Sequence, residues 1–185
     1  MIFNLIVLFL ILTIFHFLYE GIIAPSIRLK LKYNLFAIRD QLRALLREPR
    51  VSQFSEDVYS HLQSSINNLI KFLPVIDILS IAKAEQKFNE DETLRQEVMR
   101  VTRMLEDCKS PDVQEIRSRI RRIFAMAIFV NNGMLMFYSF PIVILSASAK
   151  AFFKKIVSAI QELLYMPESE FGRLMPLQIR SHGLR

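Results

Sequence analysis

Cysteine occurs once in this chain, histidine three times and glycine four times, and tryptophan is absent. Cys108 has no partner within the chain, which excludes an internal disulfide framework. The histidines and the cysteine are too widely spaced to resemble zinc ligands, so we expect no metal site. The sequence also lacks a Gly-rich phosphate loop, a Gly-x-Ser-x-Gly turn and a His-Glu-x-x-His pair, so we expect neither a cofactor nor catalysis.

Charged residues are few compared with apolar ones, at 23% against 52% of 185 residues. This composition is too apolar for a disordered chain. The length allows one compact unit, or a small domain with membrane segments, and excludes a multidomain enzyme. Lys and Arg outnumber Asp and Glu by 24 to 18, which makes the chain basic.

The first long apolar run covers residues 2–24 and contains one carboxylate, Glu20, near its end. As a helix this run extends about 34 Å, which is enough to cross a bilayer. A cleaved signal peptide is the alternative, but no Lys or Arg precedes the run and the run is too long. We therefore expect a first transmembrane helix over residues 1–25, with a bend at Pro25.

A second apolar run covers residues 123–149 and includes Pro141. Its first arm, residues 123–130, would extend only about 12 Å as a helix, so one crossing with a kink at Pro141 is preferred to a hairpin. A third run, residues 69–82, is shorter and contains a lysine, a proline and an aspartate. It predicts a buried helix outside the membrane, begun or kinked at Pro74.

Between the two long runs, apolar residues recur at helical spacing in four stripes. Each stripe lies on one face of an amphipathic helix and must be buried. Ser55 and Ser110 each precede acidic residues and are expected to begin helices. The last stripe continues into the second run without interruption, which predicts one helix of about 35 residues that could transmit changes to the membrane. The stripes are Leu35, Ile38, Leu42 and Leu45; Val58, Leu62, Ile66, Leu69 and Leu73; Leu94, Val98, Val101 and Leu105; and Val113, Ile116, Ile120 and Ile123.

These patterns predict an all-α integral membrane protein, with two transmembrane helices flanking a cytoplasmic helical bundle. The expected divisions are a transmembrane helix over residues 1–25, the helical domain over 26–122, a transmembrane helix over 123–149, and an amphipathic helix with an irregular tail over 150–185. The apolar face of that amphipathic helix, residues 153–164, suits either the bilayer surface or a partner.

Basic residues are concentrated beside the two runs. They predict that the domain between the runs is cytoplasmic and that the N-terminus is outside a bacterial inner membrane, although the tail lysines 150, 154 and 155 count against this orientation. The same residues are expected to attract anionic lipid head groups. No aromatic residues interleave with them, so nucleic acid is not an expected partner. The candidate head-group residues are Arg28, Lys30, Lys32, Arg117, Arg119, Arg121 and Arg122.

Five polar residues lie within the expected spans. Thr13, His16 and Glu20 share one side of the first helix, because they are three and four residues apart. Asn131 and Asn132 are expected about 12 Å deep, level with His16. One interpretation is that these groups hold the two spans, or two copies of the protein, together. The other is that they line a polar path in an oligomer.

Membrane effectors of bacterial defence, small channels and membrane adaptors all share such an architecture. We expect a non-enzymatic inner-membrane protein whose helical domain binds its own copies or a protein partner and so controls the transmembrane helices, as a membrane-perturbing or pore-forming effector does. The alternative is an adaptor or scaffold that tethers a soluble enzyme to the bilayer. An enzyme acting on lipid is a third class, which would need acidic residues clustered around His61.

Overall fold

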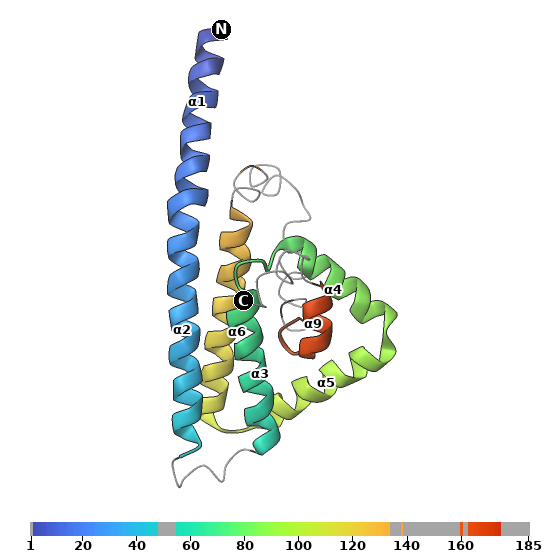
Figure 1. Cartoon of the computed structure of the whole chain (residues 1–185). Helices are drawn as coiled ribbons and strands as arrows, with labels where there is room; N and C mark the ends of the chain where they lie inside the picture. The colour runs from blue at the N-terminus through green and yellow to red at the C-terminus, as the bar shows by residue number, and fades with distance from the viewer. Residues whose placement is uncertain (1, 48–54, 134–137, 139–159, 161–162, 175–185) are drawn as a thin grey trace, which may run out of the picture.

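The computed structural model describes residues 2–47, 55–133, 138, 160 and 163–174, and most of these are helical with no strand among them. The structure confirms an all-α fold (Figure 1). The elements are α1 (Ile2–Leu18), the π-helical turn η1 (Tyr19–Ile23), α2 (Ala24–Leu45), α3 (Glu56–Phe72), α4 (Ile78–Glu90), α5 (Glu92–Asp107), α6 (Pro111–Asn131) and α9 (Glu168–Leu174).

The first three elements form one continuous rod, Ile2–Leu45. No residue of α1 is buried, whereas α2 is buried along one face from Ala24 onward. Figure 1 shows α1 leaving the remaining helices and projecting alone. Within the described residues, this rod is the only helix long and apolar enough to cross a membrane.

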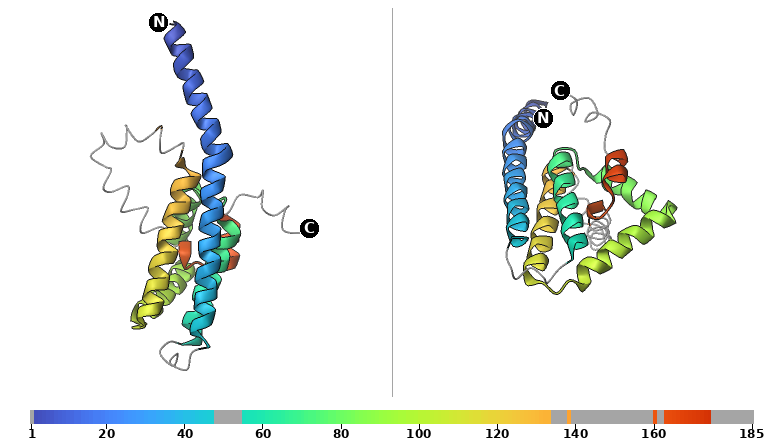
Figure 2. Two further views of the ribbon diagram at one scale, coloured as in Figure 1. Left: turned by 90° about the vertical axis from the view of Figure 1, so that its left-hand side faces the viewer. Right: turned by 60° about the horizontal axis from the view of Figure 1, so that its bottom comes forward.

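The interior of the bundle, which comprises α2 to α6 with α9, is formed by the predicted apolar stripes. Leu35, Ile38 and Leu42 of α2 are buried, and so are the predicted positions of α3, α5 and α6; Leu45 is partly buried against the same core. α2 contacts both α6 and α3, and Figure 2 shows these three helices side by side. The helical spacing therefore identified the core correctly.

Both predicted helix starts are found, but only one serine caps its helix. The Ser55 hydroxyl accepts a hydrogen bond from the Val58 amide at the start of α3. Ser110 precedes α6 without a capping hydrogen bond from its side chain, and Pro111 occupies the first turn. The helix expected over residues 69–82 is interrupted near Pro74, and the interruption separates two helices instead of kinking one. α3 ends at Phe72, and α4 begins only after Asp77, whose carboxylate accepts from the Ser80 amide at 2.7 Å. Proline cannot supply the amide that a continuous helix needs, and Asp77 caps the new helix.

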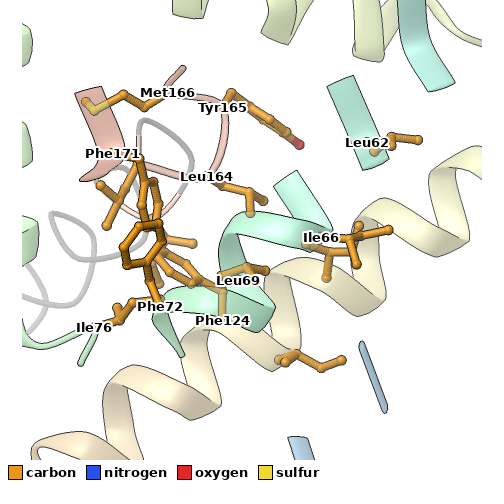
Figure 3. Close-up of a cluster of buried hydrophobic side chains, with 14 of the residues drawn as sticks. Leu62, Ile66, Leu69, Phe72, Ile76, Phe124, Leu164, Tyr165, Met166 and Phe171 are labelled. Atoms are coloured by element: carbon orange, nitrogen blue, oxygen red, sulfur yellow. The ribbon is translucent and has the colours of Figure 1, made fainter. Parts of the chain in front are cut away.

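The chain returns to the bundle near its C-terminus. Ile160, the segment from Leu163 to Met166, and Phe171 of α9 lie in the core, and Figure 3 shows several of them against α3 and α6. The rings of Phe72 and Phe171 are 5.1 Å apart, and the Ser65 hydroxyl donates to the Leu164 carbonyl at 3.0 Å.

This return differs from the expected tail. Residues 168–174 form a helix where an irregular segment was expected. The described end of the apolar face over 153–164 packs on the chain's own bundle rather than on lipid or a partner, because Ile160, Leu163 and Leu164 are buried there. Most of that face lies outside the described residues.

The second expected span also begins differently. α6 continues as one helix through Ile123 to Asn131, and Phe124, Ala127 and Ile128 lie in the bundle core. One face of the first eight residues of the span expected over 123–149 is therefore packed against protein, whereas Ala125, Met126 and Phe129 are exposed. Apart from Asn131, Asn132, Gly133 and Tyr138, the rest of that span lies outside the described residues.

Candidate functional site

A polar cluster lies where α1 leaves the bundle, and we call it the junction. It comprises Tyr19, Glu20, Arg28, Asn131 and Asn132, and it joins the rod to the end of α6 and to the turn between α3 and α4. Three of these residues were singled out in the sequence for a role inside the membrane, and Arg28 was singled out as a lipid ligand.

Asn131 is the centre of the junction. Its side-chain amide donates to the carbonyls of Leu73 and Ile76, each at 2.7 Å. Its side-chain oxygen accepts from Arg28 Nε at 2.7 Å. These contacts satisfy two carbonyls of the turn after α3, which helix geometry leaves without partners. One amide side chain therefore links α6, α2 and the α3–α4 turn.

Arg28 and Glu20 extend this network along the rod. Arg28 Nη2 lies 3.8 Å from Glu20 Oε2, so the guanidinium contacts both a carboxylate and Asn131. The single carboxylate of the first apolar run is thus paired, and a bond to a charged donor is stronger than a neutral one. Asn131 therefore bonds to Arg28 of α2 and not to a polar side chain of α1 such as His16.

Asn132 caps α4 from the other side of the turn. Its side-chain oxygen accepts from the Ile78 amide at 3.3 Å, and its amide donates to the Ile128 carbonyl at 2.8 Å. Ile78 is the first residue of α4, so its amide has no partner within the helix. Asn132 therefore fixes the start of α4 against the end of α6.

Tyr19 and Gly133 bring the rod and α6 into direct contact. The Tyr19 hydroxyl donates to the Val130 carbonyl at 3.0 Å. A Cβ atom at Gly133 would overlap the Tyr19 ring and hydroxyl, so only glycine leaves the space that this ring occupies. Neither residue was predicted from the sequence to have a role. The only available signal was a glycine following two asparagines within an apolar run.

The structure brings together only three of the five polar residues of the expected spans, because Thr13 and His16 lie outside the junction. The Thr13 hydroxyl donates to the Phe9 carbonyl of its own helix at 2.8 Å, and His16 has no hydrogen bond to any part of the chain that the structure describes. Asn131 lies instead against Arg28, which is twelve residues, or about 18 Å, beyond His16 along the rod. The expected matching depth is not found, because α6 stays in the bundle through Asn131.

The candidate head-group residues occupy three different environments. Lys30, Lys32 and Arg122 are exposed, whereas Arg121 is half-buried. Arg119 Nη1 donates to the Gln41 side chain at 2.6 Å.

Arg117 is placed in the interior instead of at a lipid surface. It is 3% exposed, and its Nη1 donates to the Leu105 carbonyl at 2.7 Å and to the Gln114 side chain at 3.0 Å. Its guanidinium also lies 5.9 Å from the centre of the Tyr165 ring. Its role in the structure is to join α6, the end of α5 and the C-terminal segment.

A hollow of about 450 Å³ lies along α5 and is open to solvent. The described residues that line it are Gln96, Met99, Arg100, Arg103, Met104 and Asp107. It combines two flexible apolar side chains with two guanidinium groups and one carboxylate.

No group of three His, Cys, Asp or Glu side chains within the described ranges is placed to hold a metal ion, and His61 belongs to no such group. The junction consists of groups that hold helices together. No family model, no curated protein and no solved structure matches this chain, so inferences about its function rest on these residues.

Proposed function

We propose that this protein is a membrane-anchored, non-enzymatic tether that holds a protein partner beside the bilayer. The observation that carries this proposal is the rod. α1 is apolar with no buried residue, and it continues directly into α2, which lies in the bundle core from Ala24 onward. Apolar helices expose this much surface to lipid rather than to water.

The proposed topology has one span rather than two. The segment 163–173 packs in the same core as α2 to α6, which supports placing it on the same side of the membrane. Gly133 and Ile160 then lie on the same side of the membrane as the bundle. The described basic residues after α1 share that side, which agrees with a cytoplasmic bundle and an N-terminus outside.

Labelling of single cysteines from outside sealed cells tests this topology. In a Cys108→Ser background, Ser169→Cys on α9 and Lys30→Cys on α2 should both resist a membrane-impermeant maleimide until the cells are permeabilised. Both positions are exposed in the bundle, so protection would come from the membrane. Labelling at Ser169→Cys but not Lys30→Cys in sealed cells would contradict the single-span arrangement and restore a second crossing.

The use of polar residues within the bundle favours a tether over a pore. Asn131 and Asn132 bind bundle groups, and Thr13 is satisfied within its own helix. His16 is the one candidate that remains for contact between copies. Thr13→Val and His16→Leu change α1 without disturbing the junction. They therefore test a pore separately from bundle stability, which a change at Asn131 cannot do. If the protein causes an ion leak on overexpression and either variant abolishes that leak, the pore function replaces the tether.

The α5 hollow is the proposed partner surface. α5 lies across the bundle from α2, which leaves it accessible when α1 is in a bilayer (Figures 1 and 2). We expect a soluble partner to co-purify with the full-length protein in stoichiometric amount. The double variant Arg100→Glu with Arg103→Glu should lose that partner at unchanged helix content. The matched variant Arg43→Glu with Arg47→Glu, at two exposed arginines far from the span, should retain it, and equal retention by both would contradict this surface.

A further inference from the structure

Large apolar side chains are exposed around the end of the bundle from which α1 emerges. Leu79 is 65% exposed, Phe129 56%, Leu29 53% and Met126 46%. They come from three helices, α4, α6 and α2, and we call them the collar. Figure 1 places the end of α6 and the start of α4 toward this end of the bundle.

The junction contacts fix the level of the collar. Leu79 follows Ile78, whose amide is bound by Asn132. Leu29 follows Arg28, which binds Asn131. Phe129 and Met126 precede Asn131 by two and five residues, or about 3 and 8 Å along α6. All four collar residues therefore lie within about two helical turns of the point where α1 leaves the bundle.

The collar continues the apolar surface of the rod. Ile22 and Ile23, just before α2, are also exposed. Exposed lysines follow at positions 30 and 32, and Arg122 follows farther from the junction on α6. Apolar groups next to the span, then cations farther away, are in the order that the acyl boundary and the anionic head groups of a bilayer require.

We propose that the collar inserts into the interfacial layer of the bilayer that α1 crosses, so that the bundle is seated on lipid rather than suspended below it. This inference rests on the proposed anchoring by α1. It adds a second membrane contact, formed by folded helices far apart in the sequence. Insertion of the collar would fix the distance between the bundle and the membrane surface, and therefore the distance of the α5 hollow from that surface.

The absence of tryptophan makes a direct experiment available. Phe129→Trp gives the full-length chain a single tryptophan in the collar, and lipid brominated on its acyl chains quenches only tryptophans near it. In vesicles containing anionic and zwitterionic lipids, we expect brominated lipid to quench Phe129→Trp strongly. Leu79→Trp provides a second reporter from α4 in case one substitution disturbs packing, and circular dichroism checks the helix content of each.

Two controls separate the collar from the anchor. Leu46→Trp is the matched control, because Leu46 is 44% exposed but lies about 33 Å from Ala24 along α2, and it should remain unquenched. Phe9→Trp lies in α1 and should be quenched by the anchor alone. Quenching of Phe9→Trp without quenching at positions 79 and 129 would overturn the collar and leave the anchor intact. No quenching of Phe9→Trp would overturn the anchor itself. A blue-shifted but unquenched Phe129→Trp would mean that protein, such as a second copy, covers this face, and that result also refutes the proposal.

Discussion

The most informative single substitution is Asn131→Leu, because it removes three hydrogen bonds while keeping similar side-chain volume. Two of these bonds go to the carbonyls of Leu73 and Ile76, and one comes from Arg28. A neutral bond contributes about 1 kcal/mol, and a bond to a charged group about 1.5–3 kcal/mol. Two carbonyls also lose their partner, so we expect the free energy of unfolding to fall by about 3–4 kcal/mol.

Urea unfolding in a mild non-ionic detergent, followed by far-ultraviolet circular dichroism, measures this loss. Asn67→Leu is the matched control, because Asn67 is exposed on α3 and its replacement should change stability by less than about 0.5 kcal/mol. If Asn131→Leu unfolds within about 1 kcal/mol of the unaltered protein, the junction does not hold the bundle together and the reasoning is refuted.

A double-mutant cycle identifies the partner of Asn131. Arg28→Met and Asn131→Leu should be strongly non-additive, with a coupling of about 1–2 kcal/mol, because each removes the same bond. His16→Leu and Asn131→Leu should be additive, because about 18 Å of helix separates His16 from Arg28. Coupling to His16 instead would restore the expected contact inside the membrane and contradict the observed junction.

Substitutions at Gly133, Asp91 and Arg117 test other contacts by the same unfolding measurement. Gly133→Ala should cost about 1–3 kcal/mol through overlap with Tyr19, and this cost should shrink in a Tyr19→Ala background. The Thr93 hydroxyl and nearby backbone amides lower the pKa of Asp91, so the stabilisation that it supplies at the start of α5 is fully present above its ordinary value of 3.8. That stabilisation is lost as pH falls through the lower folded pKa, so the difference in unfolding free energy between Asp91→Ala and the unaltered protein should narrow in strong acid. Arg117→Met should cost about 2–3 kcal/mol, and Arg117→Lys should not restore it, because one ammonium cannot reproduce the guanidinium contacts.

Local chemistry made the bundle's helices predictable. The stripe that includes Leu94, Val98 and Val101 has the three-to-four spacing that a helix needs in order to bury one face, and all three residues are buried. Ser55 and Pro111 begin helices because they satisfy or avoid amides that have no partner in the first turn. These signals depend only on neighbours within a few residues, so one sequence contains them completely.

The environment of an apolar helix is not a local property. The segment from Ile123 to Val130 has the composition of a membrane span, and a helix face that packs against protein needs the same side chains. What keeps this segment in the bundle is its contact with α2 and the bond between Asn131 and Arg28, residues 103 positions apart. Hydropathy averaged over a window cannot register such a pair, so the sequence placed Asn131 opposite His16.

The helix that connects the bundle to the expected membrane segment is the rod, and not the helix that begins at Pro111. Pro25 was expected to bend the first span at the membrane surface, and the helix beginning at Pro111 was expected to enter the bilayer. Pro25 lies in the first turn of α2, where its missing amide is tolerated, after a π-helical turn in which the Ala24 amide bonds to the Tyr19 carbonyl. The Ser26 hydroxyl donates to the Ile22 carbonyl across this point at 2.6 Å. The rod is one continuous helix from anchor to bundle, and its position against α6 is set by the packing of α2 on α6 together with the junction. Breaking the junction should therefore loosen the end of α6 from the rod, whereas α2 keeps the rest of the bundle joined to the anchor.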